Sequence, residues 1–290
     1  MNSRLILRLS RTASNIASAL LLLVTVAGAE ELPAISRLSL PTNEFIQRAD
    51  FYYVKPSGTP KAVLVLCPGK NGNGEGWIKD AVWAKFAAEH DLLLAGLSFA
   101  SKSNYPLPCY SDARTVSGEL VLEGIKQAGG EGLPILMYGF SAGARFTASF
   151  VERYPDKMLT WCACGVGQWI PPLKESKPPA GIVATGEYDA GCFWASLQYF
   201  QQGRQLDREW TWVSAPKVGH QRSKELEDFV REYFAMRLAG IGQKEAATKS
   251  EWRDIDTKKP LTTISAQENP IFATSIPGDL GVSWEKLHHP

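Results

Sequence analysis

The chain has 290 residues, enough for one large α/β domain or two small ones. Its 44% hydrophobic and 21% charged residues are typical of a globular protein with a sizeable core. The 31 basic and 30 acidic residues give a net charge of +1, so the chain lacks the basic surplus that marks a nucleic-acid-binding protein.

The N-terminal segment is typical of an export signal. Arginines near the start precede an apolar stretch from Ile16 to Val26, and Ala27-Gly28-Ala29 has the small-x-small form of a cleavage site. We therefore predict that residues 1–29 are a cleaved signal peptide and that the protein is secreted or periplasmic. An uncleaved membrane anchor is the alternative, but polar residues shorten the apolar core below the roughly 20 residues of a spanning helix, so we expect no membrane span in the mature protein.

From residue 30 to 240, apolar strand patterns alternate with helical patterns. This alternation favours an α/β fold in a single domain, with a mostly parallel central sheet and helices on both faces. Strands are expected at 50–55, 62–67, 92–97, 133–137, 158–165, 181–186 and 209–213, and helices at 77–90, 113–128, 193–203 and near the end of the domain.

The loop after the strand at 62–67 is rich in glycine. It contains four glycines between Pro68 and Gly76 but matches neither common phosphate-binding motif. In a chain that also contains Gly-x-Ser-x-Gly, a loop at this position supplies an oxyanion donor. We predict that the backbone N–H of Lys70 or Asn71 is that donor, and a plain surface turn is the alternative.

The segment Gly139-Phe140-Ser141-Ala142-Gly143 lies between an apolar strand and a helical pattern. This is the context of the nucleophile elbow, in which a strained turn lifts a serine above the sheet. Bulky residues on either side of the serine would collide with the neighbouring strand or helix. Ser141 is therefore the predicted nucleophile, and the N–H of Ala142 at the helix start is a predicted oxyanion donor.

His220 is the best candidate for the base that activates this serine. Of the four histidines, His288 and His289 lie beside the C-terminus, and His90 lies near the end of a helix. His220 lies in the loop between the last predicted strand and the last helix, where open α/β sheets place site residues.

The carboxylate that orients the base is expected just beyond the strand at 181–186. Asp189 lies three residues after Gly186, far enough to reach across the sheet edge, and is the predicted acid. Glu187 lies nearer the strand and is the alternative acid.

The order Ser141, Asp189, His220 is that of the α/β-hydrolase triad, and residues 50–240 resemble the α/β-hydrolase superfamily. The resemblance implies the α/β-hydrolase fold and a serine hydrolase that cleaves carboxylic esters through an acyl-enzyme, without a cofactor. The glycine-rich loop departs from the usual pattern because Cys67-Pro68 stand where a histidine is common. The motifs that carry the resemblance are Gly139 to Gly143, Gly186-Glu187-Tyr188-Asp189, Gly219-His220 and Pro68-Gly69-Lys70.

Three alternatives or refinements of this function stay open. The same triad cleaves amides, so a serine peptidase is possible, and a non-catalytic binding protein could keep the scaffold. Export and several aromatic residues favour a small-molecule or polymer-derived ester as substrate. One plausible histidine among scattered carboxylates predicts no metal site.

The cysteines and the C-terminal residues carry two further expectations. If a disulfide forms, Cys109 and Cys192 are the predicted pair, because both are expected on loops at one end of the sheet. Residues 241–290 are polar and lack sustained periodicity, so we predict an irregular extension that is packed on the domain through Trp252, Trp284 and other apolar residues. A mobile tail is the alternative.

Overall fold

The structure is a computed structural model that describes residues 34–102, 109–242, 250–262, 264 and 270–288. The predicted signal peptide, residues 1–29, lies outside the described residues. Within them, no helix is both long and apolar enough to cross a bilayer.

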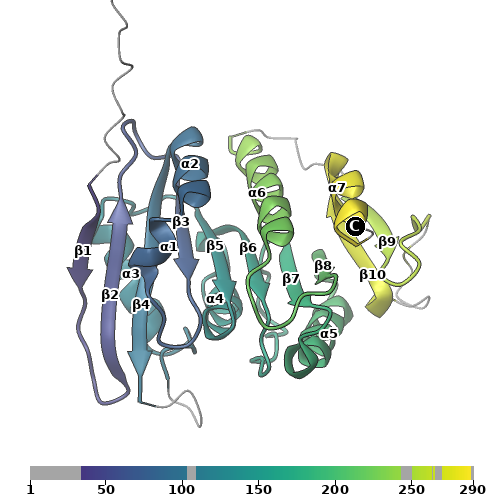
Figure 1. Cartoon of the computed structure of the whole chain (residues 1–290), viewed down its shortest axis with the longest axis horizontal. Coiled ribbons are helices and arrows are strands. Elements are labelled where there is room, and N and C mark those ends of the chain that lie inside the picture. Colours follow the sequence, from purple (N-terminus) through teal and green to yellow (C-terminus); the bar gives the residue numbers. More distant parts are fainter. Residues whose placement is uncertain (1–33, 103–108, 243–249, 263, 265–269, 289–290) are drawn as a thin grey trace, which may run out of the picture. The chain divides into compact units, whose positions relative to one another are not determined.

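An eight-stranded sheet is the centre of the described part (Figure 1), with the strand order β1-β2-β4-β3-β5-β6-β7-β8. Only the β1–β2 and β2–β4 pairs are antiparallel, and all the other pairs are parallel. The predicted mostly parallel sheet is confirmed. The strands are β1 (Ser36–Ser39), β2 (Ile46–Val54), β3 (Ala62–Cys67), β4 (Leu92–Ser101), β5 (Ile135–Phe140), β6 (Met158–Cys164), β7 (Gly181–Gly186) and β8 (Trp210–Ala215).

Helices cover both faces of the sheet (Figure 1). Along β3, Val63 and Val65 pack into one apolar cluster, whereas Leu64 and Leu66 pack into the other. This alternation explains why the strand is continuously apolar, since each face of a parallel sheet is covered by crossover helices. The first face carries α3 (Val116–Gln127), α4 (Ala142–Arg153) and α5 (Ala190–Gln205), and the second carries α1 (Gly74–Ile78), α2 (Ala81–Glu89) and α6 (Lys224–Ala239).

The single helix predicted over 77–90 is two helices in the structure. Asn73 caps α1, because its side chain accepts hydrogen bonds from the backbone of Glu75 and Gly76. Asp80 then caps α2 by accepting from the N–H of Val82. Two capping side chains seven residues apart divide the apolar stripe into separate helices.

The C-terminal extension is more regular than its sequence predicts. Its described part forms the antiparallel pair β9 (Ser250–Asp254) and β10 (Ala273–Pro277), followed by α7 (Gly281–His288). Trp284 is fully buried, and its Nε1 donates to the carbonyl of Trp212 in β8 at 2.8 Å. The extension therefore packs against β8, but the prediction of irregular structure is wrong for the described residues.

Candidate active site

Ser141 lies on a sharp turn between β5 and α4, with φ 56° and ψ −121°. A residue with a side chain rarely adopts this combination of φ and ψ, because it is strained and has to be held by the surrounding structure. A Cβ on Gly143 would lie 2.0 Å from the carbonyl oxygen of Cys67, and one on Gly139 would lie 2.4 Å from that of Gly143. Glycine is therefore required on both sides of Ser141, because the strand, the turn and the helix touch through their backbones.

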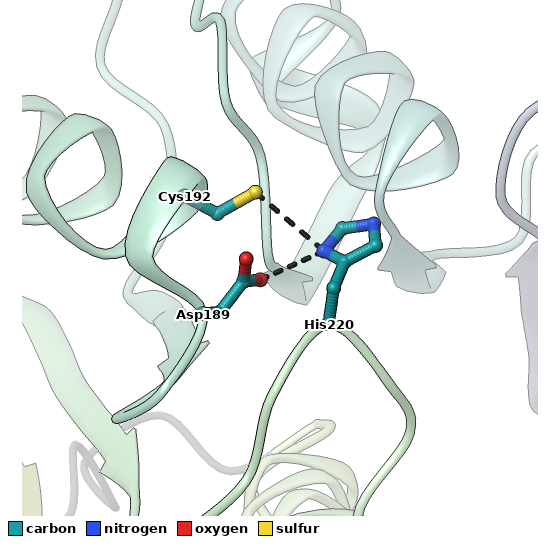
Figure 2. A group of neighbouring side chains, drawn as sticks. All are labelled: Asp189, Cys192 and His220. Atoms are coloured by element: carbon teal, nitrogen blue, oxygen red, sulfur yellow. Dashed lines mark hydrogen bonds and ion pairs between the residues drawn. The ribbon is translucent and has the colours of Figure 1, made fainter.

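His220 and Asp189 lie beside Ser141. Nε2 of His220 is 2.9 Å from Oγ of Ser141. Nδ1 of the same ring is 2.7 Å from Oδ2 of Asp189 (Figure 2). The Asp189 side chain is 7% exposed, whereas the His220 side chain is 45% exposed. The carboxylate is thus held away from water while the imidazole faces both the serine and solvent.

Close backbone contact brings Asp189 and His220 together. Asp189 directly precedes α5 just after β7, and His220 lies in the loop between β8 and α6. The N–H of Tyr188 donates to the carbonyl of Val218 at 2.8 Å, and a Cβ on Gly186 would lie 2.3 Å from the same oxygen. Adjacent parallel strands therefore deliver both side chains to the carboxyl edge of the sheet.

No protein-family model matches the chain. No curated protein matches it in sequence either. Solved structures do resemble it. An esterase from Pyrobaculum calidifontis aligns with a TM-score of 0.55 at 14% identity, covering 72% of this chain and 86% of the esterase. The fluorophosphonate-binding serine hydrolase F of Staphylococcus aureus aligns with a TM-score of 0.53 at 12% identity, covering 71% of this chain and 99% of that hydrolase. An acetyl xylan esterase from Aspergillus awamori aligns with a TM-score of 0.51 at 13% identity, covering 70% of this chain and 99% of the esterase.

The chain has the α/β-hydrolase fold. At these identities the likeness establishes the arrangement of strands and helices alone.

The glycine-rich loop of this α/β-hydrolase fold lies next to Ser141, since a Cβ on Gly69 would be 3.5 Å from Cβ of Ser141. The N–H of Asn71 donates to Oη of Tyr110 at 3.0 Å, so it is not directed at a substrate. No described residue accepts a hydrogen bond from the N–H of Lys70. Of the two predicted second donors, the N–H of Asn71 is therefore already occupied, and the N–H of Lys70 has no acceptor among the described residues. Ala142 is the first residue of α4, where a backbone N–H has no partner within the helix.

Glu187, the alternative acid, serves a different purpose. Its carboxylate accepts a hydrogen bond from the N–H of Lys217 at 2.8 Å, and the residue is exposed. It therefore stabilises the turn that follows β8.

A buried polar network anchors the loop that carries His220. Glu227 accepts hydrogen bonds from Oη of Tyr138 at 3.1 Å, from Nε1 of Trp83 at 3.3 Å and from Nη2 of Arg222 at 2.8 Å. Arg222 also donates to Asp80 at 3.0 Å. Burial, together with the nearby charge of Glu227, raises the pKa of Tyr138 well above its usual value, so its hydroxyl stays a donor.

Replacing Glu227 by alanine is expected to destabilise the protein by about 3–5 kcal/mol, because three donors then lose their buried acceptor. Denaturant unfolding followed by tryptophan fluorescence measures the change. Glu232→Ala, an exposed position on the same helix, is the matched control and should shift stability by less than about 0.5 kcal/mol. Equal, small effects of the two substitutions would show that the network does not hold the loop.

Cys192 is a neighbour of His220 that the sequence does not predict. Its Sγ lies 3.5 Å from Nδ1 of His220 (Figure 2). This is the ring nitrogen that contacts Asp189, whereas Ser141 contacts Nε2. All five cysteines are free and buried, so the predicted disulfide between Cys109 and Cys192 is wrong. The spacing of Asp189 and Cys192 in the sequence indicates that the two side chains are neighbours, because residues three apart at the start of a helix lie on one side of it. Burial and the Asp189 carboxylate raise the pKa of Cys192 to about 12.

Proposed function

We propose that the protein is a serine hydrolase that cleaves carboxylic esters through an acyl-enzyme, with Ser141 as nucleophile, His220 as base and Asp189 as acid. The observation that carries the proposal is the continuous hydrogen-bonded chain from Asp189 through His220 to Ser141, with Ser141 held at a positive φ. A base within hydrogen-bond reach of a serine, itself oriented by a third group, is the arrangement that makes a hydroxyl nucleophilic.

The proposed reaction has two halves. His220 removes the proton of Ser141 as Oγ attacks the ester carbonyl, and Asp189 stabilises the imidazolium that forms. The N–H groups of Ala142 and Lys70 hold the tetrahedral oxyanion. His220 then gives the proton to the departing alcohol, and a water molecule, activated by the same imidazole, releases the acid and restores Ser141.

Ester chemistry is preferred to amide chemistry because several solved structures with the same fold carry esterase names. One of them is named an acetyl xylan esterase and another a poly(3-hydroxybutyrate) depolymerase. These names support a small-molecule or polymer-derived ester as the substrate class of this chain as well.

The test compares matched ester and amide substrates that share one acyl group and one chromophore. Acyl length is varied in the ester series, and a feruloyl ester and an acetylated sugar are included. We expect turnover of the short acyl esters and little turnover of the amides. Faster cleavage of the amides would favour a serine peptidase, and no turnover of any ester would contradict the proposal.

A further inference from the structure

Three different metal-ligating groups converge behind the proposed base. One ligand atom each from Asp189, Cys192 and His220 lies within 4.8 Å of the other two (Figure 2). Asp189 and Cys192 come from the start of α5, and His220 comes from the loop before α6. The sequence predicts no metal site because it shows one plausible histidine among scattered carboxylates, but folding adds the thiol of Cys192 to the histidine and the carboxylate.

The chemistry of these three groups suits zinc. Thiolate sulfur, imidazole nitrogen and carboxylate oxygen are the ligands that Zn²⁺ takes in proteins, often three at a time with water in the fourth position. Zinc bonds of about 2.3 Å to sulfur and about 2.0 Å to nitrogen, at a tetrahedral angle, require roughly 3.5 Å between the two ligand atoms. Sγ of Cys192 lies 3.5 Å from Nδ1 of His220.

Asp189 has to move slightly to become the third zinc ligand. Its Oδ2 is 2.7 Å from Nδ1 of His220, and tetrahedral zinc ligation requires roughly 3.4 Å. Glycines leave room for this movement. A Cβ on Gly165 would lie 3.4 Å from Oδ2 of Asp189, and a Cβ on Gly167 would lie 3.7 Å from Sγ of Cys192. Each glycine thus leaves a methyl-sized space beside a ligand atom, and the 45% exposed side chain of His220 gives access from solvent.

We propose that Asp189, Cys192 and His220 form a zinc-binding site whose occupation switches the enzyme off. Binding would replace the hydrogen bond between Nδ1 of His220 and Asp189 by two bonds to the metal. The thiol proton of Cys192 leaves to solvent, and the imidazole proton moves from Nδ1 to Nε2, so one proton is released for each zinc bound.

Inhibition follows from the position of that proton. A neutral imidazole bound to zinc through Nδ1 carries its hydrogen on Nε2. Nε2 faces Oγ of Ser141 at 2.9 Å and would then present an N–H instead of a lone pair. The zinc-bound enzyme therefore has no base for the serine proton. This inhibitory effect rests on the proposed function, whereas binding of the metal does not.

Binding is tested first, without reference to activity. The purified full chain is titrated with Co²⁺ alone, which takes zinc sites and gives a thiolate-to-cobalt charge-transfer band. We expect this band in the wild type and its loss in Cys192→Ala and Cys192→Ser. Cys109→Ala, which removes another buried free cysteine, is the matched control and should keep the band. Circular dichroism verifies that each variant is folded.

Inhibition is tested by ester hydrolysis in increasing zinc, with each variant compared with its own metal-free rate. We expect zinc to inhibit the wild type and the control alike, a chelator to restore activity, and Cys192→Ala to need at least about tenfold more zinc. A wild type without the cobalt band, or a band that persists in both Cys192 variants, would overturn the site. Zinc that binds without slowing turnover would overturn the switch. A cobalt band in a protein that cleaves no ester would uphold the site and count against the proposed function alone.

Discussion

Ser141→Ala is expected to lower kcat on a chromogenic ester by about 10⁶-fold, because no other group can form the acyl-enzyme. KM should change little, since the removed hydroxyl acts on the reacting carbonyl and contributes little to binding of the rest of the substrate. Steady-state kinetics on the purified variant, with the amount of folded protein verified by circular dichroism, measures the loss.

The matched control for this substitution is Ser57→Ala, which removes a hydroxyl from the exposed turn between β2 and β3. It should retain the wild-type kcat. If Ser141→Ala kept more than about one hundredth of the wild-type rate, the nucleophile would have to be another group, because loss of a triad serine costs far more.

Asp189→Asn is expected to lower kcat by about 10⁴-fold without unfolding the protein. The asparagine amide cannot stabilise the imidazolium, and its NH₂ group can donate to Nδ1 of His220, which favours the tautomer with hydrogen on Nε2. Oδ2 of Asp189 lies 2.7 Å from Nδ1, so the substitution acts directly on the base. The measurement is kcat as a function of pH for the variant and the wild type. A weakened base changes the shape of this profile, whereas a smaller amount of folded protein lowers kcat equally at every pH.

Glu187→Gln is the control that decides between the two carboxylates. Glu187 accepts from the N–H of Lys217, a contact that glutamine can also make, so kcat should stay within about threefold of the wild type. The opposite ranking, with Glu187→Gln the more damaging of the two, would transfer the role of the acid to Glu187.

The three residues that the structure brings together are ones that the sequence singles out by local signals. Ser141 is identified by its flanking glycines. Gly143 lets α4 touch the backbone of Cys67 and Pro68, and Gly139 lets β5 touch α4. Asp189 and His220 follow from the ends of parallel strands, since these ends meet at one edge of the sheet. The alternation of strand and helix patterns likewise predicts the parallel sheet.

The features that the sequence does not predict depend on contacts between distant segments. The hydrogen bond from the N–H of Asn71 to Tyr110 joins two loops 39 residues apart. The sequence does not predict this contact, which uses the N–H of one of the two predicted oxyanion donors. The strands β9 and β10 are five residues each, too short for a clear pattern. β10 packs against β8, and β9 pairs with β10. Cys192 shares a helical turn with Asp189, but its contact with His220 needs the loop before α6.

The most direct measurement of the central claim is the site of covalent modification by a fluorophosphonate, which reacts with activated serines. The full chain is labelled under native conditions, digested, and analysed by tandem mass spectrometry, with a heat-unfolded sample as the reference. We predict a single adduct on Ser141 that is absent after unfolding and strongly reduced in His220→Ala. An adduct on a different residue, or equally fast labelling of Ser141 without His220, would contradict the claim that these three side chains form one catalytic unit.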